Sequence, residues 1–420
     1  MIIRPKGTYD IYGSEAKKWQ YVNEVIDAFC QNYNYDFIRT PVFESSDLFH
    51  RDGDESDMVK KETYDFKDKG DRNITLRPEG TAGVVRSYIE NKMYGDPEKP
   101  TKLYYNETMY RYERPGSGRD REFTQFGVEV LGSDDAYIDA EVISLPIRIF
   151  EALGFRNLKV NVNSLGDKES RKNYTDALIE YLKNHIDNMC EDCKRRYETN
   201  PLRILDCKVD GESDIIKNAP KITDYLNEES KKRFDQVLSY LDALDIEYVI
   251  DPNTVRGLDY YDHTVFEIVC DVKELGSANV VAAGGRYNNL VSQLGGPETP
   301  AVGFACGIGR IIFAMEKLGI EINDKKEMDV FIMYVSDTEK EHAIYLAQEL
   351  RLNGFKVELE NMGRSLKAQF KQADRLNSKF LIILNDEDLK NGEIQIKDNL
   401  TKEENKIAES EVVEYLDGNI

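Results

Sequence analysis

Hydrophobic positions near the start of the chain recur at the spacing of an α-helix. Over residues 14–31 the apolar side chains fall three or four residues apart, which places them on one helical face: Trp19, Val22, Ile26 and Phe29. An extended segment is predicted to follow as far as Thr40, because Pro41 disfavours helical geometry in the residue before it. The chain is therefore expected to open with an amphipathic helix and a strand.

Two strands joined by an arginine-rich loop are predicted next. They cover residues 103–113 and 123–131. Because strand side chains alternate between faces, the second strand has a polar face with Gln125, Gly127 and Glu129. Its other face is apolar and carries Phe126, Val128 and Val130. On the first strand, Arg111 and Glu113 are likewise predicted to share a face.

This set of side chains suits a polar ligand with charges of both signs. An arginine, two carboxylates and an amide on one sheet surface can meet an ammonium group, a carboxylate and a phosphate. The connecting loop adds Arg114, Arg119 and Arg121. The alternative is a solvated sheet face with scattered ion pairs, and the two strands alone do not decide between these interpretations.

A glycine-rich turn further along the chain indicates a place for a nucleotide. A charged helical stretch at 167–245 and predicted strands at 260–270 and 279–283 lead to the small residues of 303–309 and a helix. Small side chains let a nucleotide approach the backbone, and a helix N-terminus favours anionic groups. The chain contains no GxxxxGK[ST] and no GxGxxG after a strand, which argues against a P-loop enzyme and a dinucleotide-binding fold.

The C-terminal part alternates strand and helix after a charged linker at 321–327. This order predicts a small α/β domain with a largely parallel sheet. The predicted strands are 330–335, 356–359 and 380–384, and the helices are 340–353 and 365–377.

The second of these helices has a stripe of cations. They are spaced three or four residues apart and so lie on one side of the helix: Arg364, Lys367, Lys371, Arg375 and Lys379. An ordinary solvated helix face more often mixes charges of both signs. The stripe therefore favours contact with phosphate or tRNA.

Composition narrows this picture. The chain has 420 residues, of which 40% are hydrophobic and 32% charged, as expected for a globular protein that buries a core. The formal charge of −22 argues against indiscriminate coating of nucleic acid, although a local basic patch can still bind it. No secretory signal, membrane-spanning run or disulfide framework is recognisable, so a cytoplasmic protein is expected.

Six segments, which follow the family's order along the chain, resemble signatures of class II aminoacyl-tRNA synthetases. Residues 14–41 are similar to motif 1, the dimer-forming element; Arg111-Tyr-Glu113 with Phe123 is similar to motif 2; and 303–310 is similar to motif 3. Residues 256–261 (RGLDYY) and 283–287 (AGGRY) resemble the stretches that distinguish the histidine enzymes, and 75–81 (TLRPEGT) resembles the loop that receives the amino acid. Over essentially its whole length the chain resembles the histidyl-tRNA synthetase family.

The resemblance implies a role for each matching residue. Those expected to bind histidine are Glu79, Gly80, Thr81, Arg111, Gln125, Glu129, Arg256, Tyr260, Tyr261 and Tyr287. Those expected to bind ATP are Arg111, Glu113, Arg119, Phe123 and Arg310. Glu129 and Tyr261 would recognise the imidazole, because an apolar amino acid would leave the carboxylate unpaired. The catalytic set would be Arg111, Arg256 and Arg310, which stabilise charge that develops at the α-phosphate.

The implied fold class is α/β. An α+β catalytic domain on a mainly antiparallel sheet is expected at 1–325, interrupted by a helical insertion at 167–250, with a C-terminal α/β anticodon-binding domain at 328–420. The implied reaction is ATP-dependent activation of L-histidine and transfer to the 3' end of histidine tRNA, with Mg²⁺ bridging the ATP phosphates.

The expected partners are a second copy of the chain, in a homodimer, and histidine tRNA. The residues expected to contact the tRNA are Arg364, Lys367, Lys371 and Arg375. The alternative function is that of the synthetase-like, histidine-sensing regulatory subunit of ATP phosphoribosyltransferase, a protein that lacks the anticodon module.

Two stretches of the sequence carry incomplete motifs. Motif 3 usually has a glutamate before its arginine, but Gly309 precedes Arg310 here, which removes a carboxylate expected to contact magnesium or ribose. Cys190, Cys193 and Cys207 resemble part of a zinc site. Because the sequence offers no evident fourth ligand, structural thiols are preferred and no metal site is predicted.

Overall fold

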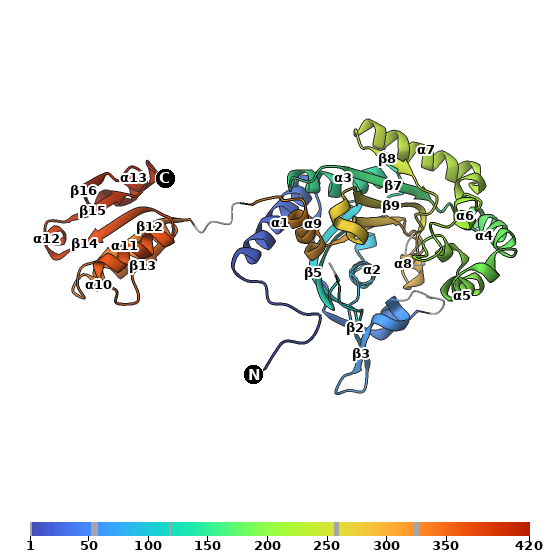
Figure 1. Cartoon of the computed structure of the whole chain (residues 1–420), viewed down its shortest axis with the longest axis horizontal. Helices are drawn as coiled ribbons and strands as arrows, with labels where there is room; N and C mark the ends of the chain where they lie inside the picture. Colours follow the sequence, from blue (N-terminus) through green and yellow to red (C-terminus); the bar gives the residue numbers. More distant parts are fainter. Residues whose placement is uncertain (1, 52–57, 117–118, 256–259, 323–326) are drawn as a thin grey trace. The chain divides into compact units, whose positions relative to one another are not determined.

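The chain folds into two compact units, Met1–Ile322 and Asn323–Ile420 (Figure 1). The computed structural model describes residues 2–51, 58–116, 119–255, 260–322 and 327–420. Each unit has its own sheet and hydrophobic core, so the mixed α/β class predicted from the sequence is confirmed. Within the described ranges, none of the helices has both the length and the apolar character needed to cross a lipid bilayer.

An eight-stranded, mainly antiparallel sheet forms the centre of the first unit. Among the described strands, the outer pairs β1–β5 and β7–β8 are parallel and the pairs between them are antiparallel. From edge to edge the strands are β1 (Asp36–Phe37), β5 (Thr101–Tyr110), β6 (Glu122–Leu131), β11 (Ala301–Gly307), β10 (Val280–Arg286), β9 (Asp262–Cys270), β7 (Leu158–Ser164) and β8 (Tyr248–Ile250). Strands far apart in the sequence therefore meet at its middle.

Helices cover the apolar face of this sheet (Figure 1). They are α1 (Gly13–Asn32), α3 (Ala136–Ala152) and α9 (Ile308–Lys317). The β6 side chains predicted to be apolar, Phe126, Val128 and Val130, are buried in the core that these helices share with the sheet. Almost all of α3 is buried, because α7 (Glu228–Ala243) packs on it as well. The opposite sheet face, with Gln125, Gly127 and Glu129, is left for the functional site.

Smaller elements complete the first unit. They include α2 (Thr81–Glu90), α8 (Leu290–Gln293) and a separate sheet of β2 (Phe43–Ser45), β4 (Asn73–Leu76) and β3 (Tyr64–Lys67). The helical stretch predicted at 167–245 contains α4 (Lys168–Leu182), α5 (Glu191–Thr199), the 3-10 turn η5 (Pro201–Ile204), α6 (Asp214–Lys217) and α7. After α7 the chain returns to the main sheet through β8.

Several predicted strand boundaries were wrong, and two of the differences affect residues of the predicted site. β5 ends at Tyr110, so Arg111 and Glu113 lie beyond the strand. The Arg111 N–H still donates to the Arg121 carbonyl at 2.9 Å, and beyond it the Tyr112 N–H donates to the carbonyl of Glu62 at 2.6 Å. Similarly, β9 begins at Asp262, and the two tyrosines before it are not in the strand.

The second unit is a five-stranded sheet with helices. Its strand order is β13 (Val357–Leu359), β12 (Met328–Tyr334), β14 (Ser378–Leu384), β15 (Glu393–Asp398) and β16 (Glu404–Ala408). The strands predicted from the sequence, β13, β12 and β14, are parallel, whereas β15 and β16 add antiparallel pairs that the prediction lacked. The helices are α10 (Lys340–Leu352), α11 (Leu366–Arg375), α12 (Asp386–Lys390) and α13 (Val412–Asp417).

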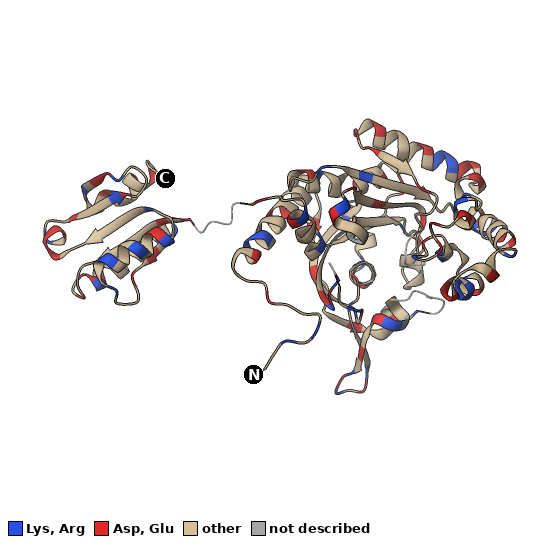
Figure 2. Ribbon diagram, in the orientation of Figure 1, with Lys and Arg blue, Asp and Glu red and all other residues tan. Residues whose placement is uncertain are grey.

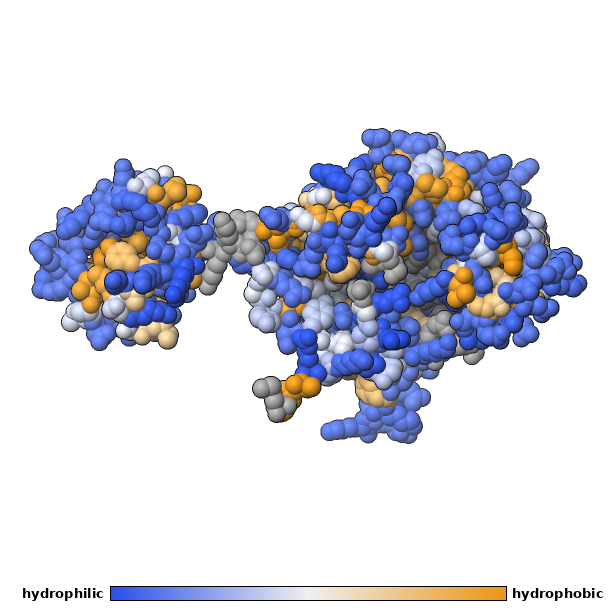
Figure 3. Space-filling model, viewed as in Figure 1, coloured by the Kyte–Doolittle hydropathy of each residue, from blue (hydrophilic) through white to orange (hydrophobic). Residues whose placement is uncertain are grey.

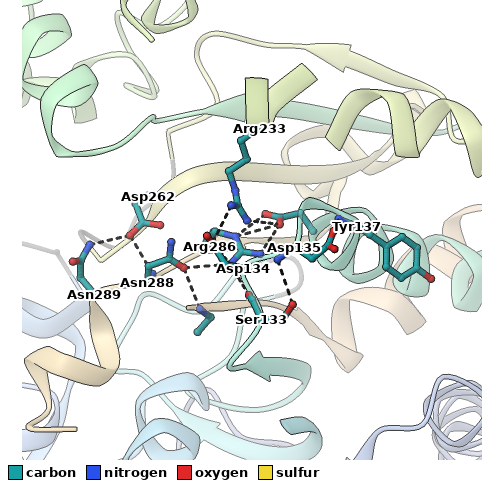
Figure 4. Close-up of polar contacts among 11 residues, drawn as sticks. Ser133, Asp134, Asp135, Tyr137, Arg233, Asp262, Arg286, Asn288 and Asn289 are labelled. Atoms are coloured by element: carbon teal, nitrogen blue, oxygen red, sulfur yellow. Dashed lines mark hydrogen bonds and ion pairs between the residues drawn. The ribbon is translucent and has the colours of Figure 1, made fainter. Parts of the chain in front are cut away.

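A buried ion pair ties the main sheet to the helices behind it. Arg286, at the end of β10, contacts Asp139 of α3, with Nη2–Oδ2 at 2.5 Å and Nε–Oδ1 at 3.1 Å (Figure 4). Arg233 of α7 reaches the same carboxylate at 3.4 Å. Burial opposes ionisation of Asp139, yet Arg286 and then Arg233 hold its pKa below the usual value. The pair therefore fixes β10, and the adjoining Tyr287, against α3.

Replacing Arg286 tests how much this pair stabilises the fold. Arg286→Met leaves Asp139 buried with the more distant Arg233 as its cationic partner, and should lower the free energy of unfolding by about 3–5 kcal/mol. Urea denaturation of the variant and the wild type measures the difference. The double variant Arg286→Met/Asp139→Leu should regain part of the loss, because the uncompensated carboxylate is gone. A single variant as stable as the wild type would contradict the assignment.

Candidate active site

A cavity of about 920 Å³ lies on the open face of the main sheet. Most residues predicted to bind a ligand line it: Glu79, Thr81, Arg111, Glu113, Arg119, Phe123, Gln125, Glu129, Tyr260, Tyr261, Tyr287 and Arg310. Gly80 is buried next to the cavity without lining it, and its N–H donates to Oε1 of Gln125 at 3.2 Å. Arg256 lies outside the described residues. The structure thus brings together side chains from segments spread over more than half of the chain.

Small residues form the floor of this cavity. In the sheet register, Glu129 of β6 is followed across the strands by Gly303 and Gly285, and Gly127 is followed by Ala305 and Ala283. A Cβ atom on Gly303 would collide with Oε2 of Glu129. Glycine at this position is therefore needed for the Glu129 side chain to lie across the neighbouring strand.

Glu129 is a carboxyl group with almost no exposure to solvent. The hydroxyl of Thr81 donates to its Oε1 at 2.7 Å, that of Tyr105 lies 3.4 Å from the same oxygen, and Tyr287 donates to Oε2. Burial, reinforced by the nearby Glu79, raises the pKa of Glu129 from 4.5 to about 8, although the hydroxyl donors oppose the shift. At neutral pH this carboxyl group is therefore mostly protonated, and a basic ligand would favour its ionisation.

Three tyrosines form the wall beside this carboxyl group. The ring of Tyr260 lies 4.8 Å from that of Tyr261 and 5.7 Å from that of Tyr287, measured between centroids. All three side chains are buried. Their flat, apolar surfaces with hydroxyl groups at the edge suit a planar ring that also forms hydrogen bonds.

A second polar group lies at the start of α2. The carboxylate of Glu79 accepts hydrogen bonds from the N–H groups of Thr81, at 2.6 Å, and Ala82, at 2.9 Å. These bonds hold Glu79 in place where it lines the cavity with Thr81 and Gln125. A carboxylate, a hydroxyl and an amide form a suitable subsite for an ammonium group.

The position of the Tyr105 ring explains why two residues near this subsite are glycines. A Cβ atom on either Gly80 or Gly127 would collide with its ring. The ring therefore fills the space between β6 and the start of α2. Sequence reasoning did not assign a role to Tyr105, although its buried hydroxyl faces Glu129.

The other end of the cavity is cationic. The guanidinium of Arg111 lies over the ring of Phe123, 5.1 Å from its centroid, and its Nε donates to the Pro78 carbonyl at 2.8 Å. Arg119 lies 3.8 Å from the carboxylate of Glu113. Arg310 donates to the carbonyl of Val280 at 3.0 Å.

These charges influence one another. Burial, followed by the repulsion of Arg119, lowers the pKa of Arg310, and Glu113 and Glu267 only partly compensate. Burial also raises the pKa of Glu113 despite Arg111 and Arg119. The cluster thus concentrates positive charge in a partly desolvated place, which a polyanion such as a triphosphate would neutralise.

Several residues that line the cavity were missed by the sequence prediction. Glu267 could have been found, because it follows Val265 at the alternate spacing of β9. Tyr9 comes from the N-terminal segment, which gives no periodic signal; its hydroxyl lies 3.3 Å from where a Cβ of residue 309 would be. Tyr9 therefore borders the space beside Gly309, where the family's motif carries a glutamate.

The cationic stripe of the second unit lies mainly on α11. Lys367, Lys371 and Arg375 are exposed, and Figure 2 shows basic residues along this helix. Within the described part of the chain, no carboxylate forms an ion pair with any of these three. The two cations at the ends of the stripe form ion pairs: Arg364 with Glu360 at 3.1 Å and Lys379 with Asp329 at 3.3 Å.

Comparison with known proteins covers both units. A family model described as histidyl-tRNA synthetase matches residues 7–311, and one described as anticodon binding domain matches residues 329–419. The histidine–tRNA ligase of Staphylococcus carnosus (strain TM300) is 49% identical over 419 residues, covering 99% of this chain and 98% of that protein.

Solved structures agree with these matches. The crystal structure of apo histidyl-tRNA synthetase from S. aureus has a TM-score of 0.85 and 45% sequence identity, covering 99% of this chain and 100% of the other. The histidyl-tRNA synthetase from Nostoc sp. PCC 7120 shares the fold, with a TM-score of 0.71 and 20% identity over 100% of this chain and 99% of the other. From the family model, the full-length relative and the shared structure, we conclude that the chain belongs to the histidyl-tRNA synthetase family.

Proposed function

We propose that this chain activates L-histidine with ATP and transfers the histidyl group to the 3' end of histidine tRNA. The observation that carries the proposal is a single cavity with a buried carboxyl group and three tyrosines at one end and three arginines at the other. Membership of the family supports the same activity, because the related Staphylococcus protein is named histidine–tRNA ligase. The matches across both units favour this activity over that of a regulatory subunit.

Histidine would bind at the carboxylate-lined end. Its imidazole would meet Glu129 and Tyr261, with Tyr260 and Tyr287 as walls, and its ammonium group would meet Glu79, Thr81 and Gln125, which Gly80 helps to hold. Selectivity follows from the cost of desolvation, because an apolar side chain would cover Glu129 without offering it a partner.

ATP would bind at the cationic end. Phe123 would stack on the purine, and Glu113 would accept a hydrogen bond from the adenine amino group. Arg111 would hold the α-phosphate, while Arg119 and Arg310 would hold the γ-phosphate side. The cation–π contact between Arg111 and Phe123 keeps these two groups adjacent before the nucleotide arrives.

The first step is an in-line displacement at the α-phosphorus. A carboxylate oxygen of histidine attacks, the bond to the bridging oxygen breaks, and pyrophosphate leaves with its electron pair. No side chain is required as a nucleophile, so the catalytic residues Arg111, Arg256 and Arg310 would position the reactants and stabilise charge. In the second step a hydroxyl of the terminal tRNA ribose attacks the histidyl carbonyl, and AMP leaves.

Magnesium would enter with the phosphates of ATP. Glu113 and Glu267 are among the carboxylates near the arginine cluster, and they suit a hard cation that takes its other ligands from phosphate and water. Bound there, Mg²⁺ would neutralise phosphate charge. Gly309 contributes no carboxylate to the site.

We assign a separate role to each predicted domain. Residues 1–325 would form the catalytic domain, 167–250 its helical insertion, and 328–420 the anticodon-binding domain. The exposed cations Lys367, Lys371 and Arg375 on α11, with Arg364 beside them, would contact tRNA phosphates.

We also propose a homodimer in the cytoplasm. Aromatic side chains on short strands of the first unit, Phe37, Phe43 and Phe66, are about half exposed, at 57%, 58% and 47%. Exposed apolar groups of this size favour burial against another copy. All six cysteines are free thiols, which suits a reducing compartment.

Amino-acid-dependent exchange of pyrophosphate into ATP tests the activity. Each proteinogenic amino acid is assayed separately, and we expect exchange with histidine alone. Glu129→Gln should lower kcat/KM for histidine roughly 10–100-fold, since a hydrogen bond to a charged group contributes about 1.5–3 kcal/mol.

The matched control is Glu122→Gln, which changes an exposed carboxylate at the start of the same strand and should leave exchange unaltered. No exchange with histidine by the wild type would favour the regulatory function instead. Equal loss in both variants would argue against a specific role of Glu129.

The tRNA contact is tested by changing Lys367, Lys371 and Arg375 together to glutamine. Loss of phosphate contacts should weaken binding of histidine tRNA and reduce the slope of log K against log salt concentration by up to about 2–3. Pyrophosphate exchange without tRNA should be unchanged. A control with Lys340, Lys356 and Lys402 changed in the same way should bind tRNA normally. If both triple variants bind equally, the stripe is not the contact surface.

A further inference from the structure

Four metal-ligating side chains meet in the helical part of the first unit. They are Cys190, Cys193, Cys207 and Asp210, and one ligand atom of each lies within 4.8 Å of all the others. The sequence suggested only the three thiols, because a carboxylate three residues after the last cysteine gives no recognised spacing. Asp210 is the candidate for a fourth ligand that the sequence alone does not indicate.

Local structure explains why these residues converge. Cys190 directly precedes α5 and Cys193 lies in its first turn, so both thiols are at the same end of the helix. The N–H of Cys190 donates to Oδ2 of Asp210 at 2.9 Å, and the N–H of Gly211 donates to the Cys207 carbonyl at 2.8 Å. A Cβ atom on Gly211 would lie 2.5 Å from that carbonyl oxygen, so glycine permits the turn that brings Asp210 back.

The sulfur spacing distinguishes a metal site from a disulfide. Sγ of Cys190 and Sγ of Cys207 are 3.6 Å apart, far beyond the roughly 2.05 Å of a disulfide bond. Tetrahedral zinc with Zn–S bonds of about 2.3 Å places its sulfurs roughly 3.8 Å apart. The cluster therefore needs only small adjustments to hold zinc.

Polar contacts join the four ligands. Sγ of Cys207 lies 3.9 Å from Oδ2 of Asp210, the oxygen that accepts from the N–H of Cys190. Such hydrogen bonds orient the ligands of a metal site. Buried apolar residues pack around the cluster, among them Met189, Leu205 and Ile216.

We propose that Cys190, Cys193, Cys207 and Asp210 bind one structural zinc ion. Soft thiolates with one carboxylate suit zinc and not magnesium or calcium, which prefer sets of oxygen ligands. Four protein ligands leave no open position, so the ion would have a structural role.

The proposed zinc site lies close in the sequence to residues that line the active-site cavity. Arg203, Asp206 and Lys208, which flank Cys207, line that cavity. Arg203 and Asp206 pair at 3.2 Å, and Arg196 of α5 lies 3.7 Å from Asp206. Zinc would therefore fix the segment that carries these charges at the border of the cavity.

Metal analysis of the purified full-length chain tests the proposal. We expect one zinc ion per chain, with an X-ray absorption spectrum that fits three sulfurs at about 2.3 Å and one oxygen at about 2.0 Å. Cys207→Ser should lose the zinc. Asp210→Asn should bind it at least about tenfold more weakly, since even changes behind the direct ligands cost roughly 10–100-fold. Cys30→Ala, at a cysteine far from the cluster in sequence and structure, should keep it.

A second measurement avoids dependence on variants that fold poorly. Wild-type protein stripped of metal is titrated with Co²⁺, and a tetrahedral thiolate spectrum saturating at one equivalent is expected. Absence of both stoichiometric zinc and this spectrum would overturn the proposal. So would a mass that is two hydrogens lower in the protein as purified from reducing buffer, with Cys190 and Cys207 disulfide-bonded.

Discussion

Burial of the Glu129 carboxyl group is the constraint on which the rest of the site depends. A charged carboxylate in so dry a place is costly unless hydrogen bonds and an opposite charge compensate it. Thr81 and Tyr287 supply hydrogen bonds, but no cation among the described residues pairs with Glu129. Under the proposed function, the ligand would supply the missing opposite charge, because an imidazole can accept a proton near neutral pH.

The fold accommodates the buried Glu129 carboxyl group in two ways. Small residues such as Gly303 and Gly285 lower the floor so that a long acidic side chain can lie on it, while the large apolar residues point to the other face and fill the core. The Arg286–Asp139 pair then anchors β10 from behind, so that Tyr287 closes the pocket next to Glu129. The cationic cluster lines the same cavity as Glu129. The face of the molecule seen in Figure 3 is largely hydrophilic.

Alternation and local spacing predicted much of this arrangement. The two faces of β6, the helix α1 and the parallel strands of the second unit could be read from the order of apolar and polar residues, because these patterns report directly on burial. Alternation also indicated Arg111 and Glu113, although both lie beyond the end of β5. The family resemblance added Arg310 and a role for each of the three residues. The predicted end of β5 was wrong: the strand ends at Tyr110, and the chain beyond it contacts the distant Glu62, which no local pattern indicates. Tyr9, Tyr105 and Asp210 were missed for the same reason: their roles arise from contacts between segments that have no common pattern in the sequence.

Proton uptake on histidine binding tests the central claim most directly. Calorimetry in buffers of different ionisation enthalpy gives the protons exchanged per histidine, for the wild type and for Glu129→Gln. Free Glu129 titrates near pH 8 and imidazole near about 6.5, whereas the bound pair should share one proton at any intermediate pH. At about pH 7 the two proteins should therefore exchange the same number of protons, and at about pH 9 the wild type should take up about one more. Equal uptake at both pH values would contradict the pairing of the imidazole with a buried, protonatable Glu129.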